Sequence, residues 1–537
     1  MQKLLLLGDE AIAQAGIDSG MSGMYAYPGT PSTEIMEYVQ RSSAAAAKNI
    51  HRQWSANEKT AMEAALGMSY AGKRAMVAMK HVGLNVAADG FVNSAITGVN
   101  GGLIVVAADD PSMHSSQNEQ DSRFYAKFSF VPVLEPSNQQ EAYDMVFAGF
   151  ELSEKYRVPV MLRITTRLAH SRSGVQRHPD VEQNTLSLPS DPRQFVLLPA
   201  IARRRYHALL GTYETMRRDT LLNGFNTYYP GTDRRLGIIA FGIAYNYLME
   251  NYPDRDIPYP VLKVSSYPPE NILFERIDAD SDELLILEEG YPIMEELLRG
   301  ILPGERKIRG RLDGAVPREG ELNPNIVASA LDLPSTYGGD VPSVVRMRPP
   351  SFCKGCGHAD MYLALHEALS SYDPGRVFSD IGCYTLGALP PYNAINSCVD
   401  MGASVTMAVG AADAGLVPAV AVIGDSTFTH SGMTGLLDAV LKNSPVTIII
   451  SDNSTTGMTG GQQSHATDRL EAICGGLGVE REHIRVIVPL KKNHEDNIAV
   501  MKEELSYQGV SVIIARRECI QTASRRKKEA AKQNEKN

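Results

Sequence analysis

The sequence predicts a multidomain α/β protein built on parallel β-sheets. Apolar, strand-like runs such as RAMVAMK, GGLIVVAA and VPVMLRI alternate with Ala-rich helical stretches, which is the order of βαβ units. The chain has 537 residues, of which 43% are hydrophobic, and this is more than one hydrophobic core accommodates. We therefore expect several domains, each with its own parallel sheet.

Changes in composition divide the chain into five segments. Residues 1–175 have the alternating pattern of a first α/β domain, and the polar, proline-containing residues 176–200 are expected to be a linker. Residues 201–345 contain two strand–turn–helix patterns, which predict a smaller α/β domain. Residues 346–522 alternate strands (PAVAVIG, PVTIIIS, VSVIIAR) with helices as a third α/β domain, and the charged residues 523–537 are expected to be a disordered tail.

Composition and charge favour small-molecule chemistry over nucleic-acid or membrane binding. The net charge is −10 and no sustained basic stripe is present, although backbone binding to nucleic acid requires clustered Lys and Arg. The start, MQKLLLLGDE, has four consecutive Leu, which is too few for a signal sequence or a membrane span. We therefore expect a soluble, cytoplasmic protein.

The six cysteines all follow residue 350, whereas the disulfide framework of a secreted protein would be dense and spread along the chain. Cysteines gathered in one third of a cytoplasmic chain suggest a metal site.

Two neighbouring strands of the third domain end in oxygen-rich loops. GDSTFTHSG follows the strand PAVAVI, and DNSTTGMTGGQ follows the strand PVTIIIS. Ligands of an open α/β sheet bind at the carboxyl ends of its strands. Mg²⁺ prefers carboxylate, amide and backbone oxygens, and Asp425, Asn453 and the carbonyl of Thr455 supply that set. The sequence therefore predicts a magnesium site at this edge.

The residues around this site suit a diphosphate. Glycines in the second loop allow backbone N–H groups to approach phosphate oxygens, and Gly424 and Ser426 lead into a helix whose N-terminus favours anions. The alternative is that Asp425 is only a helix cap and the second loop only a flexible connection. The paired arrangement favours the cofactor interpretation. The glycines concerned are Gly457, Gly460 and Gly461.

These motifs resemble those of a known enzyme family. GDSTFTHSG and DNSTTGMTGGQ resemble the thiamine-diphosphate motif, and with FCKGCGH, DIGCYTLG, YAYPGTPSTEI and VIIARREC they look like the 2-oxoacid:ferredoxin oxidoreductases, above all the indolepyruvate ferredoxin oxidoreductase alpha subunits. The resemblance covers residues 1 to about 520. It implies a pyrimidine-binding domain, a transketolase C-terminal-like domain and a diphosphate-binding domain, in that order, with thiamine diphosphate and Mg²⁺ as cofactors.

The resemblance also implies roles for two residues of the first domain. Glu58 in WSANEKTAMEAALG matches the family glutamate that hydrogen-bonds N1′ of the aminopyrimidine ring, an acid that the cofactor chemistry requires. Thr30 in YPGTPS matches the threonine beside the substrate carbonyl. Without the resemblance, Glu58 would be a first-turn residue that favours the helix dipole, and Thr30 a plain turn residue.

The chain departs from the family at the substrate carboxylate. The related pyruvate enzymes have an arginine just after the strand that corresponds to GGLIVVAADDP, where this chain has Asp109 and Asp110. Arg123 is the nearest replacement, and a surface ion pair is the alternative role for it. Loss of the arginine fits arylpyruvates, such as indolepyruvate, better than pyruvate.

The cysteines match the family positions that bind a [4Fe–4S] cluster, and thiolates are its usual ligands. The matching residues are Cys353, Cys356, Cys383 and Cys519. Zinc is the alternative, because a lone CxxC is often a zinc site. Cys398 and Cys474 fall outside the pattern and are expected to be small buried residues. The family places His358 near the diphosphate.

A second departure concerns electron exit. Long alpha subunits of the family continue into a ferredoxin-like domain with two CxxCxxCxxxCP runs, and this chain ends at Asn537 without them. The resemblance implies a heteromer with a smaller beta subunit that helps to form the coenzyme A site, and a ferredoxin-like acceptor.

The activity implied is oxidative decarboxylation of aryl 2-oxoacids to aryl-acetyl-coenzyme A. Two alternatives stay open: a non-oxidative thiamine-diphosphate-dependent decarboxylase, and a non-catalytic scaffold subunit.

Overall fold

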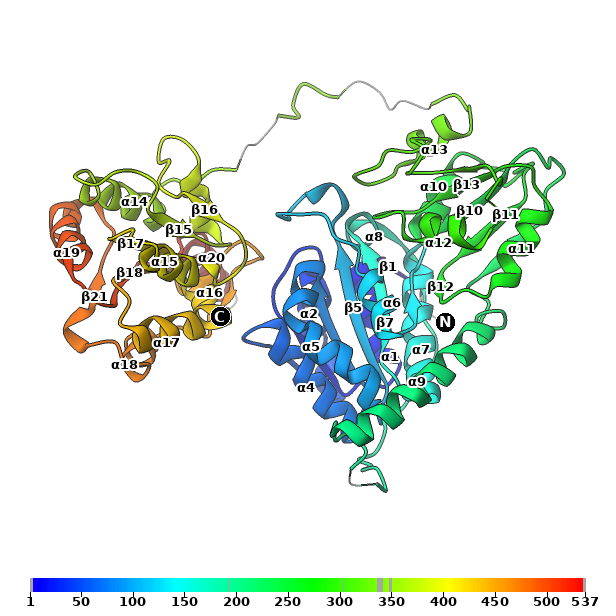
Figure 1. Cartoon of the computed structure of the whole chain (residues 1–537), viewed down its shortest axis with the longest axis horizontal. Helices are drawn as coiled ribbons and strands as arrows, with labels where there is room; N and C mark the ends of the chain where they lie inside the picture. The colour runs from blue at the N-terminus through cyan, green and yellow to red at the C-terminus, as the bar shows by residue number, and fades with distance from the viewer. Residues whose placement is uncertain (1–2, 192, 303, 336–340, 347–349, 535–537) are drawn as a thin grey trace. The chain divides into compact units, whose positions relative to one another are not determined.

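The chain folds into two compact units, residues 1–340 and 341–537 (Figure 1). The computed structural model describes residues 3–191, 193–302, 304–335, 341–346 and 350–534. Both units consist of helices packed on mainly parallel sheets, so the predicted α/β fold class is confirmed. Among the described residues, no helix combines the length and the apolar composition that a membrane crossing requires.

The first unit contains a seven-stranded sheet in the order β12-β6-β7-β5-β4-β2-β3, in which every neighbouring pair except β12–β6 is parallel. Its strands are β2 (Gly23–Ala26), β3 (His51–Trp54), β4 (Ala75–Lys80), β5 (Leu103–Asp109), β6 (Val133–Leu134), β7 (Val160–Thr165) and β12 (Ser266–Tyr267). A separate antiparallel pair joins β1 (Lys3–Leu7) to β8 (Arg172–Gln176). The helices of this part are α1 (Gly8–Asp18), α2 (Thr33–Arg41), α3 (Ser43–Ala47), α4 (Glu58–Tyr70), α5 (His81–Thr97), the 3₁₀ turn η1 (Pro111–Met113), α6 (Arg123–Ser129), α7 (Gln139–Tyr156) and α8 (Thr166–His170).

Both faces of the seven-stranded sheet are covered. Successive side chains of a strand point to opposite faces. Accordingly, Ile104 and Val106 of β5 belong to one core and Leu103 and Val105 to another. Burial on both faces explains why β4 and β5 are continuous apolar runs rather than alternating ones.

The first unit also contains a five-stranded sheet in the order β14-β13-β10-β11-β9, parallel except for β9. Its strands are β9 (Thr227–Tyr229), β10 (Gly237–Phe241), β11 (Val261–Val264), β13 (Leu284–Leu287) and β14 (Ile308–Arg309), and its helices are α9 (Pro199–Asp219), α10 (Ile243–Glu250), α11 (Asn271–Ala279), α12 (Ile293–Ile301) and α13 (Pro324–Ala330).

The two segments predicted as separate domains, 1–175 and 201–345, share one unit. Strand β12 belongs to the later segment and pairs with β6 of the earlier one. The predicted linker 176–200 forms neither helix nor strand over its described residues from 177 to 198. It packs on the first segment, where Val181 N–H donates to the Asp18 carbonyl (2.7 Å) and Phe195 stacks on Tyr70.

The second unit contains a six-stranded, all-parallel sheet in the order β16-β15-β17-β18-β22-β21. The strands are β15 (Val377–Ser379), β16 (Ser397–Cys398), β17 (Ala419–Gly424), β18 (Val446–Asp452), β21 (Ile484–Ile487) and β22 (Ser511–Arg516), with the short pair β19 (Thr455–Thr456) and β20 (Gln462–Gln463). The helical elements are α14 (Gly357–Ala368), η2 (Cys383–Ala388), α15 (Ala403–Asp413), α16 (Asp425–Thr427), η3 (Phe428–Gly432), α17 (Met433–Lys442), α18 (Leu470–Gly476), η4 (Arg481–His483), η5 (Lys491–Asn493), α19 (His494–Ser506) and α20 (Ile520–Asn534).

The segment 523–537, predicted to be a disordered tail, is helical in its described part. Helix α20 extends to Asn534, and residues 535–537 lie outside the described residues. The physical reason is composition: Ala, Glu, Lys, Arg and Gln are strong helix formers, so a charged segment is not for that reason unstructured.

Candidate active site

The two oxygen-rich loops of the second unit lie at the same edge of its sheet. Strands β17 and β18 are parallel neighbours, with Gly424 opposite Ser451. Asp425 follows the first strand and Asn453 the second, so register alone places them side by side. A helical run begins at Asp425 as α16, passes through the π-helical turn η3 and continues as α17. Single π-turns in helices are frequent at functional sites.

Asp425 has the surroundings of a carboxylate that holds a cation. Its side chain is 2% exposed, and within the described part of the chain its Oδ2 has no hydrogen-bond partner. Burial and the neighbouring charge of Asp452 raise its pKa to about 7, because both disfavour a second negative charge. Asp452 itself is held by Arg516, whose Nε lies 2.6 Å from its carboxylate. A divalent cation at Asp425 would supply the missing positive charge.

The second loop is folded on itself rather than flexible. The side-chain oxygen of Asn453 accepts a hydrogen bond from Thr455 N–H (3.0 Å), and the hydroxyls of Ser426 and Thr456 are 2.8 Å apart. Gly460 and Gly461 have φ of 126° and 89°, which favour glycine. The contact between Ser426 and Thr456 joins the two loops that are predicted to bind a diphosphate.

Four cysteines line one cavity of the second unit together with His358 and Asn453. They are the four predicted cluster ligands Cys353, Cys356, Cys383 and Cys519. Cys519 reaches the cavity because β22 is a neighbour of β18, and its N–H donates to the Asn453 carbonyl (3.1 Å). The glycine loop approaches closely, since a Cβ at Gly457 would lie 3.0 Å from Cys383 Sγ. Cysteines and diphosphate loop therefore form one site.

All six cysteines are free thiols, and two lie away from this cavity. Cys474 is fully buried in the core, as predicted, whereas Cys398 is exposed, which corrects the expectation that it is buried. Burial and the neighbouring cysteines raise the pKa of Cys383 to about 12. A bound metal centre would reverse that shift by stabilising the thiolate.

His358 lies at the wall of the cavity. The residue is 4% exposed, and its Nδ1 is 3.5 Å from Cys356 Sγ. Burial lowers the pKa of the imidazole to about 4, so it is neutral at pH 7. Its buried Nε2 has no hydrogen-bond partner among the described residues, which leaves it available to a ligand.

Glu58 and Thr30 follow two neighbouring strands of the first unit. Thr30 lies in the turn after β2, and Glu58 starts α4 after β3. Glu58 is 5% exposed and packs against α5 at Gly83, where a Cβ would lie 2.6 Å from its Oε1. A side chain at residue 83 would therefore displace the Glu58 carboxyl, so Gly83 leaves room for it.

Lys80, at the end of β4, was missed by the sequence analysis. Its ammonium donates to the Ser115 carbonyl (2.6 Å), and the Ser115 hydroxyl donates to the Thr30 carbonyl (3.3 Å). Burial lowers the pKa of Lys80 to about 8, although the nearby Asp110 opposes that shift. The sequence signal was available: a Lys that closes an otherwise apolar buried strand is unusual.

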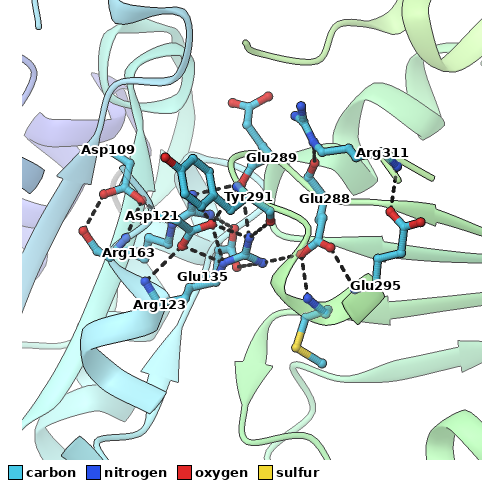
Figure 2. A network of polar contacts seen from close by, with 12 residues as sticks. Asp109, Asp121, Arg123, Glu135, Arg163, Glu288, Glu289, Tyr291, Glu295 and Arg311 are labelled. Carbon is cyan, nitrogen blue, oxygen red and sulfur yellow. Dashed lines mark hydrogen bonds and ion pairs between the residues drawn. The ribbon is translucent and has the colours of Figure 1, made fainter. Parts of the chain in front are cut away.

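Arg123 lies in a buried ionic network (Figure 2), which corrects the surface ion pair considered for it. Its side chain is 3% exposed and pairs with Asp121 (2.6 Å) and Glu288 (3.0 Å), so it is not in a surface ion pair. These carboxylates already neutralise the guanidinium, so its position does not support binding of a substrate carboxylate.

Asp109 is part of the same network and pairs with Arg163 (2.7 Å). As Figure 2 shows, the network joins the seven-stranded part of the unit to the loop after β13.

Comparisons with known proteins agree with this geometry. Residues 14–209 match the family model described as pyruvate flavodoxin/ferredoxin oxidoreductase, thiamine diphosphate-binding. Residues 380–514 match the thiamine pyrophosphate enzyme, C-terminal TPP-binding domain. The first match contains Thr30, Glu58 and Lys80, and the second contains Asp425, Asn453 and Cys383.

Whole-chain relatives are named indolepyruvate oxidoreductase subunit IorA. The protein from Archaeoglobus fulgidus is 38% identical, over 99% of this chain and 89% of its own length. That from Methanothermobacter thermautotrophicus is 37% identical, over 96% of this chain and 87% of its own length.

A solved 2-oxoglutarate:ferredoxin oxidoreductase from Magnetococcus marinus shares the fold, with a TM-score of 0.51 at 16% identity over 62% of this chain and 65% of that one. The family assignment rests on the sequence matches and not on this structural likeness. The chain belongs to the IorA family, the alpha subunits of the thiamine-diphosphate-dependent 2-oxoacid:ferredoxin oxidoreductases.

Proposed function

We propose that this chain, with a smaller beta subunit, catalyses the oxidative decarboxylation of aryl 2-oxoacids to aryl-acetyl-coenzyme A and passes the electrons to a ferredoxin-type acceptor. The observation that carries the proposal is the single cavity that four free thiols share with a glycine-rich loop of the diphosphate-binding type. That combination suits an enzyme that both binds a diphosphate cofactor and removes electrons from it.

The residues of the second unit would hold the diphosphate and its metal. Asp425, Asn453 and the Thr455 carbonyl would bind Mg²⁺, which prefers oxygen ligands. The backbone N–H groups of the glycine loop would face phosphate oxygens. The buried Oδ2 of Asp425 supports the metal site, because a buried carboxylate without a partner is costly unless a cation binds it.

In the first unit, Glu58 would donate a proton to N1′ of the aminopyrimidine ring. Thiamine diphosphate, when bound, would supply a nucleophilic carbon and an electron-accepting thiazolium ring. The task of Glu58 would be to hold a proton at one atom, from a side chain that is buried.

The sulfur positions support an iron–sulfur cluster over zinc. A tetrahedral zinc ion holds its sulfur ligands about 3.8 Å apart. Among the described residues, no three of the cysteine sulfurs lie within 4.8 Å of one another, although four line one cavity. Four thiolates are the normal ligand set of a [4Fe–4S] cluster, and four cysteines line this cavity.

The substrate class and the partners rest on the relatives and on charge. The whole-chain relatives are named for indolepyruvate. Asp109 and Asp110 stand where the pyruvate enzymes have an arginine, so a small 2-oxoacid would lack its usual cation. Lys80, which is linked to Thr30 through Ser115, is the cation best placed to contact a substrate carboxylate.

Product analysis tests the proposal. The chain is purified without oxygen together with its beta subunit and incubated with indolepyruvate, with and without coenzyme A and an electron acceptor. The proposal expects an aryl-acetyl thioester and a reduced acceptor, both dependent on coenzyme A. An aldehyde that forms without coenzyme A would instead identify a non-oxidative decarboxylase, and no calorimetric binding of thiamine diphosphate would identify a scaffold subunit.

A further inference from the structure

Three side chains of metal-binding type gather at a second place in the first unit, on helices α1, α2 and α8, which are labelled in Figure 1. They are Asp9 near the start of α1, Glu34 in the first turn of α2, and His170 at the end of α8. One ligand atom from each lies within 4.8 Å of the other two, and His170 Nε2 is 3.5 Å from Glu34 Oε2. None of the three belongs to the candidate active site.

Asp9 is the residue that points to a ligand. It is 0% exposed, and within the described part of the chain neither carboxylate oxygen has a hydrogen-bond partner. Asp9 does not cap the start of α1. The backbone N–H of Leu7, at that end of the helix, donates to the Glu10 carboxylate instead (2.9 Å). Burial of a carboxylate with no partner is unfavourable, because the group loses its hydration and gains no hydrogen bond or counter-charge in return. An ordinary first-turn acid that favours the helix dipole would be exposed.

The charges around Asp9 are negative. Burial and the carboxylates of Glu34 and Glu10 raise the pKa of Asp9 well above its usual value. Glu10 is drawn toward Arg172 (3.5 Å), and Glu34 toward His170. Within the described part of the chain, Glu10 and Glu34 therefore have cationic partners, whereas neither oxygen of Asp9 has a hydrogen-bond partner.

The geometry points to a divalent cation site formed by Asp9, Glu34 and His170. Two carboxylates and one imidazole suit a first-row divalent ion such as Mn²⁺ or Zn²⁺. Ligand bonds of about 2.1 Å place donors about 3.5 Å apart, a separation that His170 and Glu34 already have, and Asp9 lies within 4.8 Å of both. The side chains of Glu34 and His170 are 35% exposed, so this side of the site is partly open to solvent.

The site is built where three helices meet. A Cβ at Gly8 would lie 2.2 Å from the Leu168 carbonyl oxygen, so α1 contacts the backbone of α8 directly. Helix α2 begins three residues after Thr30. A bound cation would therefore fix the start of α2 and, with it, the turn that carries Thr30, and it would do so whatever reaction the protein catalyses.

Manganese binding tests the site. The full chain, freed of metal and without thiamine diphosphate, is titrated with MnCl₂ while electron paramagnetic resonance measures free Mn²⁺, an ion for which thiolates compete poorly. The parent is expected to bind one more Mn²⁺ ion per chain than either Asp9→Asn or His170→Ala. If the variants still bind this additional ion, the parent is expected to bind it at least about 10-fold more tightly. Mn²⁺ should also raise the melting temperature of the first unit in the parent, and raise it less or not at all in Asp9→Asn.

Two control variants isolate the effect. Asp425→Asn removes the proposed magnesium ligand of the other unit, and Glu482→Gln alters the exposed cluster of Glu480, Glu482 and His483; both should keep the extra Mn²⁺. Without metal, Asp9→Asn should melt no lower than the parent, because it removes an unpaired buried acid, and this shows that the variant folds. Equal Mn²⁺ binding by the parent, Asp9→Asn and His170→Ala, or no binding by the parent, would overturn the site.

Discussion

At the scale of single residues, burial in the second unit favours the neutral form of two groups that are candidate ligand contacts. Asp425 is a buried acid whose pKa is raised to about 7, and His358 is a buried base whose pKa is lowered to about 4. Burial is the first cause of both shifts, since it disfavours whichever form is charged. A cation would restore the charge of Asp425, whereas a neutral His358 is already suited to accept or donate one hydrogen bond.

Asp425→Asn is expected to weaken Mg²⁺-dependent binding of thiamine diphosphate by roughly 100-fold, which corresponds to about 2.7 kcal/mol. The physical reason is that the variant removes a carboxylate ligand and leaves the diphosphate charge less neutralised. Calorimetric titration with and without Mg²⁺ measures the effect. Asp438→Asn, which alters an exposed pair with Lys442 on α17, is the control, and tight binding by Asp425→Asn would disprove the assignment.

Glu58→Gln is expected to leave cofactor binding intact and to slow exchange of the thiazolium C2 proton by a factor on the order of 100, because acid–base assistance at N1′ is lost. Proton NMR of the bound cofactor in deuterated water measures this rate. Glu63→Gln, on the exposed face of the same helix, should exchange at the parental rate. Unchanged exchange in Glu58→Gln would remove the proposed role.

Cys519→Ala is expected to lower the iron content of anaerobically purified protein and to slow acceptor reduction, while thiamine-diphosphate binding remains. Its thiol lines the cavity with three others, and loss of a fourth ligand destabilises a [4Fe–4S] cluster. Iron analysis and the visible absorption spectrum measure the change. Cys474→Ala is the matched control because Cys474 lies in the core; iron loss in the control alone would transfer the ligand role to it.

At the scale of elements, the ionic network holds the loop after β13 against the ends of β5 and β7 (Figure 2). Arg163 is fully buried and contacts Asp109 through Nε (2.7 Å) and the Glu289 carbonyl through a terminal nitrogen (2.9 Å). A buried ion pair adds little net stability compared with apolar packing, but removal of one partner leaves an uncompensated charge. The network therefore specifies how the two sheets of the unit join.

Arg123→Met is expected to destabilise the first unit by about 3–5 kcal/mol, because Asp121 and Glu288 lose the cation that compensates their burial. Urea unfolding followed by circular dichroism measures the loss. Lys127→Met, an exposed position on the same helix, should change stability little. Parental stability with a raised KM for the 2-oxoacid would instead restore the substrate-binding role that the sequence suggested for Arg123.

At the scale of the whole molecule, the chain consists of two compact units, and each has its own hydrophobic cores. The candidate site residues divide between them: Glu58, Thr30 and Lys80 lie in the first unit, and the cysteines and the two loops predicted to bind a diphosphate lie in the second. Each unit should therefore respond separately to substitutions and to pH.

We expect calorimetry to resolve two unfolding transitions, one for each unit. Glu289→Gln is expected to change only the transition of the first unit. Burial raises the pKa of Glu289 from 4.5 to about 7, so the folded state retains a proton that the unfolded state releases. This contribution to the stability of the first unit is complete below pH 4.5 and is lost as the pH rises through 7, by up to about 3 kcal/mol.

Glu289→Gln keeps a neutral acceptor for Leu322 N–H, so the first unit of the variant should lose less stability between pH 5 and pH 8 than that of the parent. Glu319→Gln, at an exposed position, should follow the parent. A single transition, or equal pH dependence in parent and variant, would contradict the expectation.

The sequence by itself determined the features that depend on short segments. Asp425 and Asn453 each follow an apolar strand directly, and parallel strands of one sheet end at the same edge, so their proximity was predictable. Alternating strands and helices likewise predicted the α/β class. The charged tail was misread because net charge was weighed above helix propensity, which is also a local property.

Only the tertiary structure decided the contacts between distant segments. Arg123 faces Glu288 across 165 positions of sequence, and Asp9 lies beside His170 because α1 packs on α8; neither pairing leaves a local pattern. The same holds for Lys80, whose contact with Ser115 depends on the course of the loop after β5. Charge states of buried groups follow from these non-local contacts, because burial and neighbouring charges set the pKa and the sequence specifies neither directly.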